Sequence, residues 1–470
     1  MARRSIKQTT DKKQQLDQPD LGPVEHVAID LLKPYSGNAR THDQRQLAKL
    51  KQSLLTFGWM NPLLAERDGT IIAGHGRWSA AKALGLATCP VIRVEHLTPD
   101  AARAYRLADN RLAELAGWDA AILEIELQHL STVELDFNIE TIGWDHVEID
   151  LMLEPAAPAD ATDPVDENVG PPLPVTVTRP GDLWQLGDHR LLCGSALEAA
   201  CFATLMNGRQ AAMVFIDAPY NVPISGHVSG LGKTQHREFG MASGEMSEPE
   251  FRAFLATNAK LLAENAVDGA IIQMCMDWRG LLPLQLALAD AELSTINLAV
   301  WTKTNGGMGS LYRSQHELVL IAKKGTAPHI NNVELGKHGR YRTNVWRYPG
   351  VNSFGKNRME QLSGHPTPKP VALVADAIRD VSHRGQIVLD SFMGSGTTLL
   401  AADRTGRIAY GMDLDPAYVD LAIRRWEKMT CSRATLASTG QTFAEVAEAR
   451  ADETSAGMSS IVAKSTASSS

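Results

Sequence analysis

The residues best suited to chemistry stand together in the tetrapeptide Asp217-Ala218-Pro219-Tyr220. The apolar residues 214–216 in front of it predict a buried strand, which ends here because Pro219 lacks the N–H that further pairing needs. The acid and the aromatic ring are therefore expected at the carboxyl end of a strand, where open α/β sheets bind ligands. A strand that merely runs into a proline turn is the alternative that the tetrapeptide alone leaves open.

The tetrapeptide suits the handling of a flat, weakly nucleophilic amino group. The carboxylate of Asp217 can accept one amino hydrogen, and the main-chain carbonyl of Ala218 can accept the other. The ring of Tyr220 can stack on the plane of a base. All four residues of the tetrapeptide are therefore predicted to be catalytic.

A second candidate site begins at Asp390 with the run Asp-Ser-Phe-Met-Gly-Ser-Gly-Thr-Thr. The run lies between a predicted strand and a predicted helix, and the next predicted strand, 408–412, ends at Asp413. A glycine turn after one strand and an acid at the end of the next are typical of a nucleoside site, in which the acid binds the ribose hydroxyls. The dinucleotide fingerprint would need a third glycine at Leu399, so NAD is disfavoured, and S-adenosylmethionine, a nucleoside without phosphates, fits better.

Together the two motifs resemble those of the amino-methylating DNA methyltransferases, which act on adenine N6 or cytosine N4. Their signature Asp-Pro-Pro-Tyr is matched from Asp217, with alanine in place of the first proline, and their Phe-x-Gly-x-Gly loop is matched from Phe392. The run His-Pro-Thr-Pro-Lys-Pro at 365–370 matches the segment that precedes the loop in the family. The tetrapeptide comes before the loop, which is the permuted order of the β class.

The resemblance covers about residues 180–427 and implies both the cofactor and the reaction. The implied reaction is transfer of a methyl group from S-adenosylmethionine to the N6 amino group of adenine at specific sites in double-stranded DNA. Adenine is favoured because adenine members of the family usually carry Asp at the first position of the tetrapeptide; cytosine N4 is the alternative. The implied cofactor-binding residues are Asp390, Phe392, Gly394, Gly396, Thr397, Asp413, Ser195 and Lys369.

Two positions depart from the family pattern. Relatives usually have Gly-Asp where this chain has Gly194-Ser195, and the missing acid would contact the adenine of the cofactor, so a reduced cofactor affinity is expected. Ala218 keeps the main-chain carbonyl but lacks the fixed φ of proline. The rival interpretation is a DNA-binding protein whose methyltransferase half is attenuated.

The net charge of −8 is unevenly distributed along the chain. Residues 131–170 contain eleven acids and no Lys or Arg, whereas residues 301–370 contain eleven basic residues and three acids. Within the second stretch, residues 324–360 combine basic and aromatic side chains, which favours a DNA-recognition insert over a charged loop in solvent. The predicted DNA-binding residues of the insert are Arg340, Arg342, Arg347, Lys356 and Arg358.

Near the amino end, a glycine turn at 74–76 leads into a predicted helix that carries Arg77, and such a helix start is an anion site. Residues 27–118 resemble the ParB-like nuclease or partition domain, whose members bind DNA or a nucleotide and some of which are assigned nuclease activity. Arg77 is the predicted DNA-binding residue here, unless it only pins the helix to a neighbouring loop. No acid cluster accompanies it, so we predict no metal site and a DNA tether instead of a nuclease.

These patterns divide the chain into five parts. Residues 1–22 are expected to be disordered, residues 23–153 to form the ParB-like domain, and residues 154–179 to be a linker. Residues 180–430 are expected to form the methyltransferase domain, and residues 431–470 a mostly disordered tail with one helix near 443–451. The alternation of strands and helices predicts an α/β fold with a doubly wound, Rossmann-like sheet, preceded by a smaller α+β domain.

The remaining features of the sequence concern the location of the protein, its cysteines and its partners. No apolar run reaches the roughly 18 residues of a membrane span, and residues 1–20 are polar, which favours a cytoplasmic protein without a membrane partner. The five cysteines lack Cys-x-x-Cys spacing and are interpreted as free thiols. A homodimer and a paired restriction enzyme are both left open.

Overall fold

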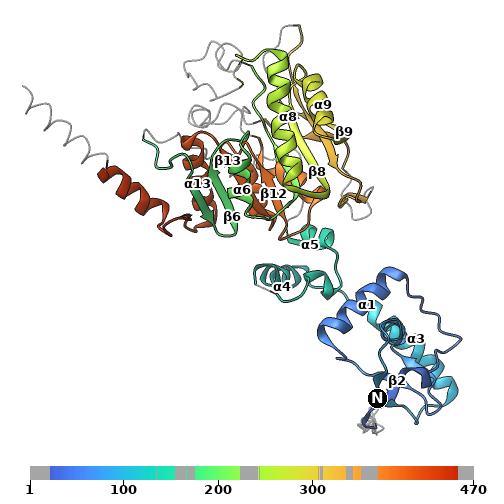
Figure 1. Cartoon of the computed structure of the whole chain (residues 1–470). Helices are drawn as coiled ribbons and strands as arrows, with labels where there is room; N and C mark the ends of the chain where they lie inside the picture. The colour runs from blue at the N-terminus through green and yellow to red at the C-terminus, as the bar shows by residue number, and fades with distance from the viewer. Residues whose placement is uncertain are drawn as a thin grey trace, which may run out of the picture. The chain divides into compact units, whose positions relative to one another are not determined.

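The computed structural model of the chain describes residues 22–133, 135–153, 166, 175–222, 242, 244–304, 306, 311–334, 342–350 and 369–453. The chain divides into two compact units, residues 1–145 and residues 146–470 (Figure 1). No helix within the described ranges is long and apolar enough to cross a membrane.

The first unit is built on a four-stranded sheet. In spatial order the strands are β1 (Val24–Ala28), β4 (Thr88–Arg93), β2 (Leu63–Ala65) and β3 (Ile71–Ala73). β2 and β4 are parallel, and the other two pairs are antiparallel. The helical segments are η1 (Ile29–Leu31), α1 (Gln44–Phe57), α2 (His75–Ala83), α3 (Pro99–Leu115), α4 (Ala120–Thr132) and η2 (Ile139–Ile142). This mixture is the small α+β domain that the sequence predicts.

Side-chain caps and one glycine define where the helices of the first unit begin. Asp43, Thr98 and Asp119 accept hydrogen bonds from the first free N–H groups of α1, α3 and α4. Gly74 precedes α2 with a left-handed φ of 95°, which glycine adopts without strain. An added Cβ there would lie 2.5 Å from the Leu63 side chain, so only glycine lets α2 begin this close to β2.

The second unit contains a ten-stranded sheet with the order β11-β9-β10-β8-β7-β12-β13-β6-β5-β14. The five central strands, from β8 to β6, are mutually parallel, and β10 is antiparallel to both β8 and β9. The strands are β5 (Leu183–Leu186), β6 (His189–Cys193), β7 (Ala211–Ile216), β8 (Ala266–Met276), β9 (Leu293–Thr302), β10 (His316–Lys324), β11 (Val345–Arg347), β12 (Ile387–Asp390), β13 (Ile408–Asp413) and β14 (Thr435–Leu436).

Helices cover both faces of this sheet, and each face has its own apolar core. Along β7, Met213 and Phe215 join one core, and Val214 and Ile216 join the other, as the period of two in a strand requires. α11 (Val371–Val381), α12 (Thr397–Arg404) and α13 (Pro416–Thr430) pack on the first face; α6 (Ala199–Met206), α8 (Glu248–Glu264) and α9 (Leu281–Asp290) pack on the second. This doubly wound, Rossmann-like arrangement confirms the predicted fold class.

The structure places two boundaries differently from the sequence. Helix α5 (His146–Leu153), expected to close the first domain, belongs to the second unit because Asp150 is buried there and binds Arg407 through both carboxylate oxygens. The tail expected to be mostly disordered from residue 431 is folded as far as residue 453. β14 pairs with β5, and Phe443 of the helix at 443–453 packs against Trp184. Residues 1–21 and 454–470, and most of the predicted linker, lie outside the described residues.

Candidate active site

The predicted catalytic tetrapeptide lies at the centre of the ten-stranded sheet. β7 ends at Ile216 and Asp217 is the next residue, which confirms the predicted strand and its end. β8 and β12 flank β7 as parallel neighbours, so the carboxyl ends of the three strands open on the same edge. Ala218 is buried at this edge and Pro219 follows it in irregular backbone.

Both oxygens of the Asp217 carboxylate accept hydrogen bonds from neighbouring side chains. Nζ of Lys369 donates to Oδ2 at 2.5 Å, and the hydroxyl of Tyr220 donates to Oδ1 at 2.7 Å. Lys369 stands just before Pro370, the residue that caps α11. The sequence predicts Lys369 as a cofactor-binding residue, whereas the structure places its ammonium group on the carboxylate of Asp217.

A second buried carboxylate, Glu317, completes this group. Its Oε2 lies 2.9 Å from Nζ of Lys369, and its Oε1 pairs with Lys303. The side chains of Lys369 and Glu317 are only 5% and 12% exposed. Two lysines and two carboxylates balance one another, which is the condition under which buried charges are tolerated. We call Asp217, Tyr220, Lys303, Glu317 and Lys369 the Asp217 cluster.

The direction of β10 explains why the sequence does not reveal Glu317 and Lys303. The sequence motifs lie at the carboxyl ends of parallel strands, but β10 is antiparallel to β8, so its first residues reach the edge of the sheet where Asp217 lies. Glu317 is the second residue of β10, and Lys303 directly follows β9, the other antiparallel partner of β10. An acid at the start of an otherwise apolar strand is the signal that would have found Glu317.

The cluster sets the ionisation of its own members. Burial alone would raise the pKa of the Glu317 carboxyl, but the ammonium groups of Lys369 and Lys303 outweigh burial and lower that pKa to about 2. Burial would lower the pKa of Lys369, but Asp217 and Glu317 raise it well above its ordinary value. Burial and the nearby carboxylates raise the pKa of Tyr220, so its hydroxyl stays neutral. At neutral pH the cluster therefore holds an ionised Glu317, a charged Lys369 and a protonated phenol.

The predicted cofactor loop connects β12 to α12 on the same edge. Asp390 ends β12 and accepts the N–H of Phe392 on Oδ1 at 2.9 Å. Gly394 and Gly396 both have positive φ, 52° and 87°, which allows the tight turn into Thr397, the first residue of α12. A Cβ at Gly396 would lie 2.8 Å from the Cβ of Ala422, so glycine also lets α12 pack closely on α13.

Asp413 and Ser195 adjoin this loop from the neighbouring strands. Asp413 ends β13 and accepts the N–H of Gly394 on Oδ2 at 2.8 Å and that of Asp415 on Oδ1 at 2.9 Å. Ser195 follows β6, the parallel neighbour of β13, and its Oγ accepts the N–H of Leu197. The structure therefore brings seven of the eight predicted cofactor residues to adjacent strand ends, and the eighth, Lys369, lies at the carboxylate of Asp217.

Two buried acids in this region, Asp390 and Asp413, have pKa values above those of ordinary aspartates. Burial raises the pKa of Asp390 to about 7, with hydrogen bonds from Thr398 and Phe392 opposing the shift. Burial likewise raises the pKa of Asp413 to about 6. A buried carboxyl of this kind is ready to ionise when a cation or a hydroxyl-rich ligand arrives.

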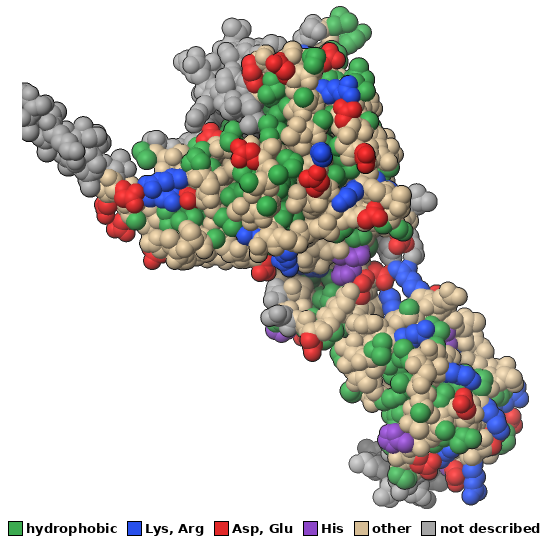
Figure 2. All heavy atoms as spheres, in the orientation of Figure 1, with side chains coloured by type: hydrophobic (Ala, Val, Ile, Leu, Met, Phe, Trp, Pro, Cys, Tyr) green, Lys and Arg blue, Asp and Glu red, His purple; other side chains and the backbone are tan. Residues whose placement is uncertain are grey.

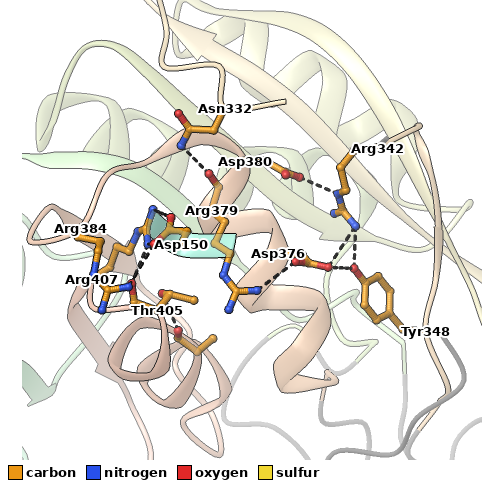
Figure 3. Close-up of polar contacts among 11 residues, drawn as sticks. Asp150, Asn332, Arg342, Tyr348, Asp376, Arg379, Asp380, Arg384, Thr405 and Arg407 are labelled. Atoms are coloured by element: carbon orange, nitrogen blue, oxygen red, sulfur yellow. Dashed lines mark hydrogen bonds and ion pairs between the residues drawn. The ribbon is translucent and has the colours of Figure 1, made fainter. Parts of the chain in front are cut away.

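The basic insert is partly structural. Arg342 lies in an ion network, in which its Nε donates to Asp380 at 3.0 Å and its Nη1 donates to the Tyr348 hydroxyl at 2.7 Å (Figure 3). Asp376 of α11 also pairs with Arg342, whose side chain is only 17% exposed. Trp346 is buried as well. Two acids of α11 thus neutralise a guanidinium that the sequence assigns to DNA.

Arg342 and Arg347 are the predicted DNA-binding residues of the insert that the structure describes, and Arg347, on the edge strand β11, is the exposed one. Arg340, Lys356 and Arg358 lie outside the described residues. On the face of the second unit displayed in Figure 2, the described Lys and Arg side chains alternate with Asp and Glu and form no large basic patch. The DNA contacts predicted for the insert stay a prediction, now centred on Arg347.

Arg77 lies beside a cavity of about 200 Å³ at the start of α2 in the first unit. Its Nη1 donates to the main-chain oxygen of Asn61 at 2.9 Å, as expected if it pins the helix to a neighbouring loop. The side chain also lines the cavity, and DNA binding by Arg77 stays a prediction. The other polar residues of the cavity wall are Asn38, Arg40, His42, Gln46, His75, Asp109 and Asn110.

Within the part of the chain that the structure describes, no three His, Cys, Asp or Glu side chains are grouped so that they could hold a metal ion. The described acids near Arg77 are single residues such as Asp109. The absence of a metal site stays a prediction.

Three family models match the chain. The DNA methylase model matches residues 211–424, which include the Asp217 cluster and the cofactor loop. The ParB N-terminal domain model matches residues 11–111, and the ParB-methyltransferase HTH domain model matches residues 121–180. The third match includes η2 and α5, a helical stretch for which the sequence motifs predict no function.

Individual proteins resemble separate parts of the chain. The ParB-like nuclease domain-containing protein YnaK of Escherichia coli is 49% identical over 69 residues, which are 15% of this chain and 79% of that protein. The type II methyltransferase M2.DpnII of Streptococcus pneumoniae is 26% identical over 234 residues, 48% of this chain and 86% of that protein. The solved M1.HpyAVI–SAM complex is 19% identical with a TM-score of 0.35, covering 50% of this chain and 98% of that one.

Proposed function

Because this chain belongs to the N6/N4 family of DNA methylases and carries a ParB N-terminal domain in front, we propose that it is an adenine-specific DNA methyltransferase. The donor of the methyl group is S-adenosylmethionine, and the acceptor is the N6 amino group of adenine at specific sites in double-stranded DNA. The observation that carries the proposal is the position of Asp217 at the end of β7, one strand away from the loop that starts at Asp390.

The loop after β12 fits S-adenosylmethionine in its chemistry. Each oxygen of Asp413 accepts one backbone N–H and keeps a lone pair, so the carboxylate can also accept from the two ribose hydroxyls. Asp390 is buried with a raised pKa, and a ligand with cationic groups would favour its ionised form. Gly394 and Gly396 keep the loop free of side chains where the ligand would approach.

The side chains at the end of β7 prepare the amino group of the target base. The cofactor supplies, when bound, a methyl group on a sulfonium sulfur, which is a good leaving group without help from a metal. Asp217 accepts one amino hydrogen and the Ala218 carbonyl accepts the other, so the nitrogen lone pair turns toward the methyl carbon. Tyr220 stacks on the base, which must leave the helix to reach this depth. Asp217 also stabilises the positive charge that develops on the nitrogen as the N–C bond forms and the C–S bond breaks.

The test of the proposal is methyl transfer from labelled S-adenosylmethionine to DNA, followed by identification of the modified base. The wild-type protein should produce N6-methyladenine. Asp217→Ala should lose methyl transfer while its affinity for S-adenosylmethionine stays within about twofold, because Asp217 faces the base side of the site. A primary loss of cofactor binding would contradict the role of Asp217, and N4-methylcytosine as the product would correct the target base.

The cavity beside α2 favours a second function in the first unit. The start of α2, together with Arg40 and Arg77, offers backbone N–H groups and two guanidinium groups around about 200 Å³. We propose that this cavity binds a phosphate-bearing ligand, either the DNA backbone or a nucleotide. Arg77→Ala should weaken DNA binding or nucleotide binding, measured separately by fluorescence anisotropy, while methyl transfer to saturating DNA persists. Metal-dependent DNA cleavage by the first unit would contradict the proposed tethering role.

A further inference from the structure

The Tyr220 hydroxyl lies between the two carboxylates of the Asp217 cluster. It is 2.7 Å from Oδ1 of Asp217 and 3.3 Å from Oε2 of Glu317. Nζ of Lys369 lies 3.3 Å away and can donate to the same oxygen. A hydroxyl has one hydrogen, so it can serve only one carboxylate at a time.

This arrangement limits Asp217 in the proposed reaction, because each of its oxygens already accepts one hydrogen bond and has only one further lone pair to offer to the base. Oδ2 is held by Lys369 at 2.5 Å, and Oδ1 accepts from Tyr220. The amino hydrogen of a target base needs one of these oxygens with a well-directed lone pair. The bond from Lys369 joins two full charges in a buried place, whereas the bond from Tyr220 has a neutral donor. The Tyr220 bond is therefore the easier of the two to redirect to another carboxylate.

We propose that Glu317 is a positioning residue that receives the Tyr220 hydroxyl hydrogen when the target base enters, which frees Oδ1 of Asp217 for the amino group. The proposal rests on the proposed methyl transfer. The change needs rotation about the phenolic C–O bond and an approach of about half an ångström toward Glu317. No covalent bond forms or breaks in it, and no charge leaves the cluster.

Glu317 is well placed to accept this hydrogen. Its Oε1 is held by Lys303, which stands beyond Trp301 at the end of β9, and its Oε2 faces both Lys369 and Tyr220. Lys369 has three hydrogens and three acceptors, namely Asp217, Glu317 and the Tyr220 oxygen. It can therefore keep all its bonds while the hydroxyl turns from one carboxylate to the other.

A purely structural role is the competing explanation, in which Glu317 serves only as the counter-ion of two buried lysines. The two roles differ in one measurable property. If Glu317 acts by accepting from Tyr220, its effect on the methylation rate depends on the presence of the hydroxyl. If it acts only as a counter-ion, its effect is the same with or without that hydroxyl.

The experiment is a double-mutant cycle measured by single-turnover methylation with saturating S-adenosylmethionine and DNA. The four proteins are the wild type, Glu317→Gln, Tyr220→Phe and the double variant. Phenylalanine at position 220 keeps the stacking ring and removes the hydroxyl. Glutamine at position 317 has only one side-chain oxygen, and that oxygen accepts a hydrogen bond from a lysine of the cluster. We expect Glu317→Gln to slow the reaction about tenfold or more in the Tyr220 protein and less than about threefold in the Tyr220→Phe protein. If Glu317→Gln slows methylation by the same factor with Tyr220 and with Phe at position 220, the proposal is overturned.

Charge balance is controlled by a second variant. Lys303→Met combined with Glu317→Leu removes one charge of each sign and every side-chain acceptor at position 317, so the cluster stays neutral and the protein should fold even if Glu317→Gln alone does not. This variant should keep cofactor affinity and remain slow, because the acceptor for the hydroxyl is still missing. Recovery of the wild-type rate would overturn the proposal in favour of the counter-ion role.

Asp380→Asn serves as a matched control, since it changes another buried carboxylate at the opposite end of α11. Its effect on the rate should be the same with Tyr220 and with Phe at that position. If the wild-type protein itself transfers no methyl group, the proposed function fails. If it does and the cycle shows no coupling, only the role of Glu317 fails.

Discussion

Position 218 is where a single side chain most directly touches the proposed chemistry. Ala218 is buried at the end of β7 and stands where the family signature has proline. Its carbonyl remains available, so what alanine loses is the restricted φ, worth about 0.4–1 kcal/mol at a compatible site. If all of that enters the transition state, the rate changes by a factor of roughly two to five. We therefore expect Ala218→Pro to speed single-turnover methylation up to about fivefold.

Ser195→Asp is the companion change, and it should act mainly on the affinity for S-adenosylmethionine, measured by calorimetry. Ser195 adjoins the strand end that carries Asp413, away from the cluster at Asp217. A jump from no activity to full activity on Ala218→Pro would mean that the natural protein is a DNA binder with an inactive methyltransferase half.

The buried carboxyl of Asp390 predicts how the cofactor-free protein responds to pH. Its folded-state pKa is about 7, above the ordinary value of an unfolded Asp, so the native state binds more protons than the unfolded state between about pH 4 and 7. The free energy of unfolding should therefore fall as pH rises through this window, by roughly 2–4 kcal/mol.

Thermal unfolding from pH 4 to pH 8 without cofactor measures this loss. Asp390→Asn resembles the neutral carboxyl and should make the profile shallower, with the raised pKa of Asp413 carrying the remaining slope, whereas Asp188→Asn, in the exposed β5–β6 turn, should leave it unchanged. The same slope in all three proteins would show that Asp390 does not carry the effect.

At the scale of elements, the insert after β10 divides into a packed part and an exposed part. Arg342 is neutralised by Asp376 and Asp380 of α11 (Figure 3). Arg347 on β11 is exposed. Arg342→Ala removes a cation that Asp376 and Asp380 share, although Arg379 still pairs with Asp376, and should lower the free energy of unfolding by roughly 3–5 kcal/mol. Arg347→Ala should leave the free energy of unfolding unchanged. It should reduce the slope of log binding constant against log salt concentration by about one, as expected for the loss of one phosphate contact.

Chemical denaturation and DNA binding at several salt concentrations separate these two effects. The result that would contradict the assignment is an unstable Arg347→Ala protein, or an Arg342→Ala protein of normal stability with weakened DNA binding. Either result would mean that the roles in stability and in DNA binding are assigned to the wrong arginines.

At the scale of the whole molecule, α5 determines where the second unit can be cut. Arg407 is fully buried and its charge is balanced by Asp150, which also pairs with Arg384 (Figure 3). A protein that starts near Pro174 lacks Asp150 and leaves the Arg407 guanidinium buried without a carboxylate. It should be less stable by roughly 3–5 kcal/mol than a protein that starts just before His146.

Denaturant unfolding of the two truncated proteins tests this prediction, with Asp150→Asn in the longer one as the control for the ion pair alone. Both truncated proteins should transfer methyl groups when folded, with weaker DNA binding than the full chain, because both lack the first unit. Equal stability of the two would show that α5 contributes nothing to the second unit.

The sequence by itself determined the parts that depend on short stretches of chain. The strand before Asp217, the glycine turn before α12, the acid at the end of β13 and the doubly wound alternation are all local patterns, and the structure reproduces them. The turn residues and the period of the apolar side chains carry this information, since both act within a few residues.

Only the tertiary structure decided which charges meet. Lys369 follows Asp217 by 152 positions and Glu317 by 52, yet all three side chains form one buried cluster. Arg342 is in the basic insert but forms an ion pair with Asp380 of α11. Asp150 is in the acidic stretch but forms an ion pair with Arg407. The physical reason is that a buried charge needs a counter-charge wherever the fold supplies one, and an antiparallel strand such as β10 brings its beginning, not its end, to the edge where the parallel strands finish.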